Sequence, residues 1–258
     1  SVPLSGLIAG QSSSMMMDGW TWEDATLNHP TALHINWPNM RLNFSKNLKK
    51  KEKQQREVYQ KLLRKIDLLI RDTKAYHIRT SQKERKSEHK QHADLRLESL
   101  IPYFVNQKKI IIRAEDIRQI EAAVMWAEKH DLKIIISGGR DAWRVSELLV
   151  KHNVPIILQH VQTIPRRRFE PIHIPYKTPA LLLQKGVKFC LSTDQGYPFN
   201  GHVRTLPNEA MRAATWGLSK EEALRAITLS TAEILGIDKR VGSLEPGKDA
   251  TFFISNDS

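Results

Sequence analysis

Three side chains that can do chemistry each follow a short apolar run: Asp194, Arg113 and His160. A carboxylate or an imidazole can transfer protons, whereas a guanidinium binds anions and, being always charged, offers no lone pair to a metal. Because His160 directly follows the run 156–159, it is the histidine best placed for a functional site. The alternative for His160 is a hydrogen-bonded loop histidine.

Several other polar or reactive positions favour structural roles. Cys190 lies in an apolar run, where burial raises the pKa of a thiol, so we expect a core residue and not a nucleophile. Gly138 and Gly139 can bind an anion at the start of a helix, but a tight turn explains them as well. The arginines at 166–168 fit a solvated loop better than a contact with an acidic partner.

The elements that must position these residues alternate along the second half of the chain. Apolar runs at 110–112, 133–136, 155–158 and 187–191 are each followed by a segment with helical spacing. Continuous apolar strands separated by helices are typical of a parallel sheet that helices cover. This pattern alone does not separate a closed barrel from an open doubly wound sheet. The region 30–38 is expected to be irregular.

The net charge of +12 is concentrated in a basic segment at 45–95. Its apolar positions recur at three- and four-residue steps, which predicts an amphipathic helix from 45 to 76 with a charged outer face. No aromatic residues alternate with these charges as a stacking platform for bases would require, so nucleic-acid binding is the least favoured function. No apolar run approaches the roughly 18–20 residues of a membrane helix.

The C-terminal region carries the most specific motifs. A helix that begins with a Ser219–Glu222 capping box leads to Ala232-Glu233-Ile234-Leu235-Gly236, and then to a long turn from Gly242 to Ala250. Together with the 186–194 segment, these motifs resemble the C-terminal signature of the metal-dependent amidohydrolase superfamily, in its imidazolonepropionase-related branch.

This resemblance implies a partial (β/α)8 barrel at 1–240, with 45–95 as a basic helical insertion. It also implies that 241–258 begins a strand of a small β-sandwich. The active site then lies at the C-terminal ends of the strands, where one or two divalent metals, zinc or iron, activate a water. Asp194 takes the position of the family's metal ligand or catalytic base, the alternative being an Asp that caps a loop. His202 and Arg204 follow in a loop that contacts substrate.

The other metal ligands that the resemblance implies do not match. The chain contains no His-x-His pair, and Arg113 and Ser137 stand where histidines are expected. The standard two-metal site therefore cannot form from these residues alone. Arg113 can instead bind a substrate carboxylate, pair with Asp194, or make a structural ion pair.

Two functions remain ahead of nucleic-acid binding. The first is hydrolysis of a C–N bond in a small amide, cyclic amide or dipeptide-like substrate through metal-activated water. The second is a non-catalytic member of the family with a binding or scaffold role. Both ends of the chain look like strands from inside a fold, so we expect a fragment of a longer protein. The compartment and any homo-oligomer stay open.

Overall fold

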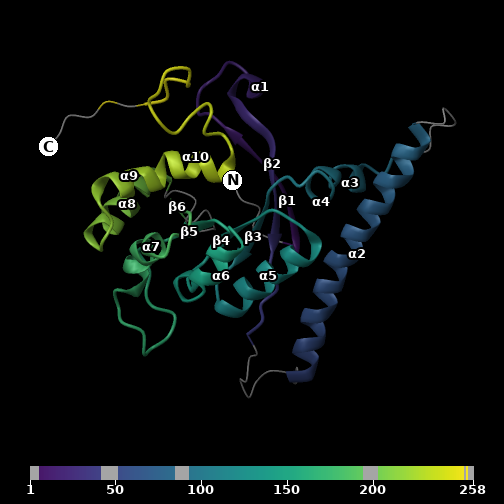
Figure 1. Ribbon diagram of the computed structural model, residues 1–258, viewed down its shortest axis with the longest axis horizontal. Helices are drawn as coiled ribbons and strands as arrows, with labels where there is room; N and C mark the ends of the chain where they lie inside the picture. Colours follow the sequence, from purple (N-terminus) through teal and green to yellow (C-terminus); the bar gives the residue numbers. More distant parts are fainter. Residues whose placement is uncertain (1–5, 42–51, 85–92, 194–202, 253, 255–258) are drawn as a thin grey trace.

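One curled sheet of six strands forms the centre of the fold (Figure 1). The computed structural model describes residues 6–41, 52–84, 93–193, 203–252 and 254. Strand β1 is antiparallel to β2, and all later neighbours are parallel. Among the described residues β1 and β6 are the two edges, so the sheet is an arc of a barrel, as predicted. The bounds are β1 Ile8–Met15, β2 Thr26–Asn36, β3 Ile110–Ala114, β4 Ile134–Gly138, β5 Ile156–Gln159 and β6 Phe189–Ser192.

The two faces of the sheet are both buried. Ile111, Ile135 and Cys190 form a small cluster with Ile234, which comes from the helix α10. We call this side of the sheet the inner face. The residues between them along the strands pack on the other side, in the main core that the helices cover. The continuous apolar runs therefore follow from burial on both faces, as predicted.

The prediction of irregular structure at 30–38 is wrong for residues 30–36, because β2 covers Thr26–Asn36. Leu33 and Ile35 point into the main core while Ala32 and His34 occupy the other face, so the segment alternates as a strand does. Leu33 pairs with Ile110 of β3. The prolines and polar residues of this region do not match an apolar strand pattern, and pairing with β1 and β3 stabilises the strand.

Helices follow β3, β4 and β5 as predicted. Helix α5 spans Ile117–His130, and its N-cap Asp116 forms a capping box with Gln119. After β4, a 3-10 turn η1 at Ala142–Arg144 precedes α6 at Ser146–Lys151. Helix α7 covers Ile174–Gln184.

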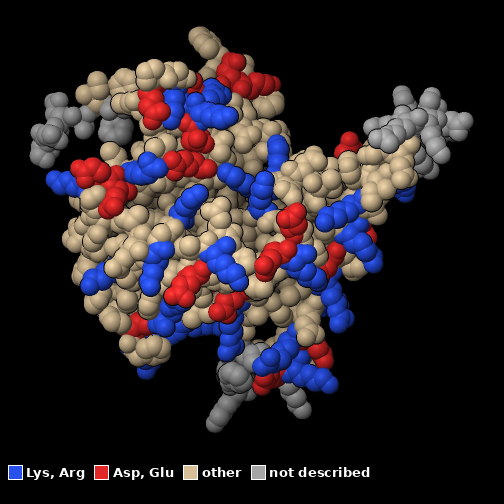
Figure 2. All heavy atoms as spheres, viewed as in Figure 1, with Lys and Arg blue, Asp and Glu red and all other residues tan. Residues whose placement is uncertain are grey.

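The basic segment forms the long helix α2, Glu52–Glu84, along one side of the molecule (Figure 1). Lys and Arg side chains follow its exposed length (Figure 2). Its buried side docks on α5 through Asp67, whose Oδ1 accepts a hydrogen bond from Trp126 Nε1 at 2.9 Å and lies 3.0 Å from His130 Nε2. The helix extends beyond the predicted end at residue 76. No helix in the described ranges is long and apolar enough to cross a bilayer.

Three helices follow β6. They are α8 Leu206–Thr215, α9 Lys220–Ile227 and α10 Leu229–Leu235. The predicted capping box of Ser219 and Glu222 is present, with both hydrogen bonds formed. The predicted single helix breaks at Thr228, whose φ of −121° and ψ of −95° are not helical. The break turns α10, so that Ile234 packs on the inner face of the sheet.

The expected strand in the C-terminal tail is not formed at 251, 252 or 254, the described part of that segment. Phe252 and Ile254 are exposed there. The assignment of 241–258 to a β-sandwich, like the domain boundary at 240, stays a prediction. The remaining short elements are α1 Trp22–Ala25, α3 Leu95–Glu98, α4 Ile101–Phe104 and η2 Val203–Thr205.

Candidate functional site

The parallel strands β2 to β6 bring their C-terminal ends to one edge of the sheet. Alternation from the buried Ile111 and Ile135 places Arg113 and Ser137 on the inner face, directly paired in neighbouring strands. Gln159 Nε2 donates to Ser137 Oγ at 3.0 Å. The inner face is therefore apolar at its middle and polar at this edge.

Arg113 supplies a fixed positive charge at the polar edge. Its side chain is partly buried on β3, and it makes no hydrogen bond or ion pair with another described residue. A guanidinium offers five donors and no acceptor, so it suits an anionic group and not a metal. Arg113 therefore makes no structural ion pair within the described ranges. The predicted pair with Asp194 is not tested, because Asp194 lies outside those ranges.

His160 stands at the end of β5 in a left-handed backbone conformation, with φ of 53°. Its amide donates to Ser192 O at 3.4 Å, which continues the pairing of β5 with β6. Non-glycine residues with positive φ are uncommon and need support from their surroundings. The structure thus keeps His160 at the carboxyl edge, as predicted.

The support comes from Glu209, a residue that the sequence did not bring to attention. Glu209 is only 4% exposed, and its Oε2 accepts hydrogen bonds from the amides of Val161 at 2.9 Å and Gln162 at 3.2 Å. Arg212 lies 3.3 Å from its Oε1. Helix α8 therefore fixes the turn that follows His160. The sequence around Glu209 does not indicate this role, because the amides that it binds lie 48 and 47 residues earlier in the chain.

The prediction that 166–168 is simply a solvated loop is wrong for Arg166 and Arg167. Arg167 makes a bidentate contact with Asp141 at 2.9 and 2.7 Å, and a further bond to Glu170 at 2.6 Å. Burial alone would raise the pKa of Glu170, but hydrogen bonds from Arg167 and Arg144 hold it below its ordinary value. The two acids are almost completely buried, so these pairs are well shielded from water.

Arg166 adds a second contact, with its Nη2 3.4 Å from Asp116 Oδ2. Both arginines come from the β5–α7 connection, and their acidic partners include residues just after β3 and β4. This connection is thereby tied to the carboxyl edge beside His160. A small cavity of about 30 Å³ lies under it, lined in part by Gln159 and His160.

Gly138 and Gly139 make the tight turn that was expected after β4. Both have positive φ, 99° and 65°. A Cβ at Gly138 would lie 2.5 Å from a carboxylate oxygen of Glu115, so a larger residue there would collide with that side chain. The helix that follows begins as a 3-10 turn, and the anion-binding alternative gains no support.

The residues that a metal would need are not assembled in the described part of the chain. No group of three or more His, Cys, Asp or Glu side chains with suitable geometry occurs there. Arg113 and Ser137, at the inner-face strand ends, supply no imidazole. Asp194 and His202 lie outside the described residues, and Arg204 is exposed in η2.

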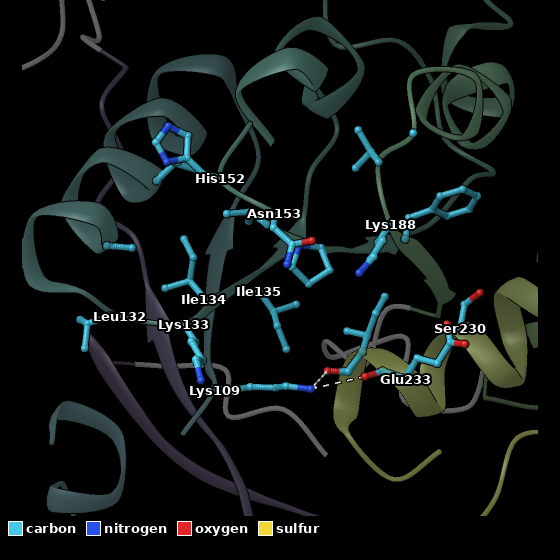
Figure 3. A pocket seen from close by; sticks show the side chains of 18 of the residues that line it. Lys109, Leu132, Lys133, Ile134, Ile135, His152, Asn153, Lys188, Ser230 and Glu233 are labelled. Atoms are coloured by element: carbon cyan, nitrogen blue, oxygen red, sulfur yellow. Dashed lines mark hydrogen bonds between the residues drawn. The ribbon is translucent and has the colours of Figure 1, made fainter. Parts of the chain in front are cut away.

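A far larger cavity, about 890 Å³, opens at the opposite edge of the sheet (Figure 3). Its lining includes the residues just before β3, β4 and β6, namely Lys109, Lys133 and Lys188. In barrels of this kind the chemistry sits at the carboxyl ends of the strands, so cavity size alone does not identify the active site.

Comparison with known proteins agrees with this architecture. An amidohydrolase from Thermotoga maritima MSB8 aligns with a TM-score of 0.75 at 21% identity, covering 95% of this chain and 62% of that one, which supports the fold. Imidazolonepropionases of Shewanella baltica (strain OS185) and Shewanella oneidensis are 40% identical over 72 and 76 residues. The chain matches only 18% and 19% of their lengths, and 28% and 30% of its own. Residues 72–257 match the amidohydrolase family, and the chain therefore belongs to that family.

Proposed function

We propose that the protein hydrolyses a C–N bond of a small amide, cyclic amide or dipeptide-like substrate. The observation that carries this proposal is the polar group of Arg113, Ser137 and Gln159 on the inner face, at the carboxyl edge of the parallel strands. In a member of the amidohydrolase family, this is the edge where substrate chemistry takes place. Family membership alone would not distinguish a retained site from a lost one.

Each residue at this edge has a role that its chemistry supports. Arg113 binds an anionic group of the substrate, because its donors are not engaged by other described residues. Ser137 and Gln159, already hydrogen-bonded to each other, present polar groups to the substrate amide. Asp194 accepts a proton from the attacking water, and His160, His202 and Arg204 contact the substrate. The roles of these last four residues are extensions of the sequence prediction.

Metal-activated water is the family's usual route, and zinc or iron remains part of the proposal for the whole protein. When bound, such a metal would lower the pKa of the attacking water. The described residues do not fit a metal centre, because Arg113 repels a cation and no ligand cluster is present among them. The roles above therefore depend only on side chains of this chain.

A second candidate is a non-catalytic member of the family that binds a small molecule. Arg113 at a strand end where an imidazole would ligate metal favours this candidate. The binding role would use the same edge and the same anionic ligand class. Metal content and turnover together separate the two functions.

The test is product release from a panel of cyclic imides, N-acyl amino acids and dipeptides, with elemental analysis of the same sample. Arg113→Gln should raise KM for carboxylate-bearing substrates by about tenfold or more, from the loss of a charge-assisted hydrogen bond. Arg113→Lys should recover part of the loss. Arg118→Gln, at an exposed arginine of α5, serves as the control for charge.

Hydrolysis of any panel member, together with a selective effect of Arg113→Gln, would support the enzyme. Stable, folded, metal-free protein that binds carboxylates without turnover would support the binding function instead. Equal KM values for the Arg113→Gln and Arg118→Gln variants would contradict the assignment of Arg113.

A further inference from the structure

The large cavity at the N-terminal edge of the sheet has no part in the proposed hydrolysis. Its volume is about 890 Å³, and Lys109, Lys133 and Lys188 surround it (Figure 3). Each lysine directly precedes a strand and lies two residues before Ile111, Ile135 or Cys190. Because side chains two residues apart along a strand share a face, all three lysines lie on the inner face. The inner face is thus polar at both ends and apolar between them.

We propose that this cavity binds a small oxyanion, a phosphate or a carboxylate, between Lys133 and Lys188. The two residues directly precede β4 and β6, which only β5 separates, so the two strands lie about 10 Å apart. The register aligns Phe189 with Ile136 through Ile156, so Lys188 lies two residues, about 7 Å, further along the strand direction than Lys133. Their Cα atoms are therefore about 12 Å apart. Two extended lysine side chains can bring their ammonium groups to one anion across that distance. The site is distinct from the carboxyl-edge site and does not depend on the proposed hydrolysis.

The other cations of the cavity are already engaged. Lys109 Nζ donates to the backbone carbonyl of Ile234 at 2.6 Å, at the C-terminal end of α10. Arg225 donates to Glu233 at 2.7 Å. Within the described ranges, the side-chain ammonium groups of Lys133 and Lys188 make no hydrogen bond or ion pair, so their charges are the ones available to a ligand.

The acids of the lining are engaged in the same way. Glu222 closes the capping box of α9, Glu233 pairs with Arg225, and Asp131 accepts from Gln107 at 2.8 Å. Glu128 Oε1 lies 3.7 Å from His152 Nδ1, and the negative charge of Asp238 raises the pKa of Lys109. The negative charges of these acids are therefore partly balanced by groups other than Lys133 and Lys188.

The charges of Lys109 and Lys133 also oppose each other. Burial lowers the pKa of Lys109, and the neighbouring positive charge of Lys133 lowers it further, while Asp238 works in the opposite direction. A bound anion would relieve this repulsion between ammonium groups. Lysine binds phosphate through a compact charge on a flexible side chain and, unlike arginine, does not need a fixed planar arrangement of donors.

The remaining lining indicates the size and polarity of the ligand. Ile134, Ile135 and Val187 add apolar lining, and Asn153 adds an exposed carboxamide (Figure 3). A small oxyanion, with or without a short apolar body, matches this combination. A large hydrophobic ligand does not, because charged residues line much of the cavity.

The experiment is a titration of the 258-residue protein with inorganic phosphate and, separately, with acetate, followed through backbone amide NMR shifts. Saturable shifts are expected at Lys133, Asn153 and Lys188. The double variant Lys133→Gln/Lys188→Gln should weaken the apparent affinity by about tenfold or more. The matched control is Lys74→Gln/Lys177→Gln, two exposed lysines on α2 and α7 with the same change in net charge.

Saturation by either ion that depends on Lys133 and Lys188 would support the site, and the preferred ion would identify the ligand class. Three results would overturn it. The first is equal affinity in the double variant and its control. The second is shifts spread over lysines of the whole surface, which means an adventitious ion only. The third is no saturation with either ion while the amide spectrum shows a folded protein.

Discussion

His34 shows how a single side chain on the inner face depends on its surroundings. His34 is 4% exposed on β2, and its Nε2 has no hydrogen-bond partner among the described residues. Burial lowers its pKa from 6.5 to about 4. The imidazole of His34 therefore stays neutral in the core, and its contribution to the free energy of unfolding depends on pH.

His34 should make the fold less stable in mild acid. Between pH 6.5 and about 4 the unfolded chain binds a proton at this residue that the folded chain excludes, so stability falls as pH falls. The slope approaches about 1.4 kcal/mol per pH unit. Urea unfolding of the unaltered chain and of His34→Leu at pH 7 and pH 5 measures it. Parallel losses in the two proteins would contradict the assignment.

Glu209 is the second residue with a defined structural consequence. Glu209→Ala leaves the amides of Val161 and Gln162 without their acceptor, at a cost of about 2–4 kcal/mol. Glu209→Gln keeps an acceptor oxygen and should lose less. Hydrogen exchange at these two amides reports the effect directly, with the exposed Glu221→Ala as control. Unchanged exchange in Glu209→Ala would show that the carboxylate does not hold the turn.

At the scale of elements, apolar pattern predicted the strands that are buried on both faces and missed the one with mixed composition. The runs that became β3 and β4 are isoleucine-rich and needed no tertiary information. Strand β2 contains Pro30 and two histidines, and only its pairing with β1 and β3 makes it a strand. The ties of Arg166 and Arg167 to the carboxyl edge join distant segments, so no local pattern could predict them.

Helix α2 tests whether the basic segment is part of the fold. Asp67→Ala removes the acceptor for the indole of Trp126 and the neighbour of His130, and should lower the unfolding free energy by about 1–3 kcal/mol. Asp72→Ala, at an exposed carboxylate on the same helix, is the matched control and should cost less than about 0.5 kcal/mol. Equal unfolding free energies for the two variants would mean that α2 does not dock on α5 in this way.

At the scale of the whole molecule, the inner face separates two polar ends by an apolar middle. The carboxyl end carries Arg113 and His160, and the opposite end carries the lysines of the large cavity. Sequence motifs predicted the family, the partial barrel and the edge at which His160 lies. They could not predict the second cavity, because its lysines precede three separate strands and meet only when the sheet forms.

The proposed hydrolysis at the carboxyl edge of this sheet requires Asp194 as its base. The most direct measurement is kcat/KM of Asp194→Asn on a substrate that the unaltered chain hydrolyses, with Asp72→Asn as control. Loss of a catalytic base should lower kcat/KM by about 100-fold or more, with the control unchanged. Full activity of a folded Asp194→Asn protein would contradict the claim.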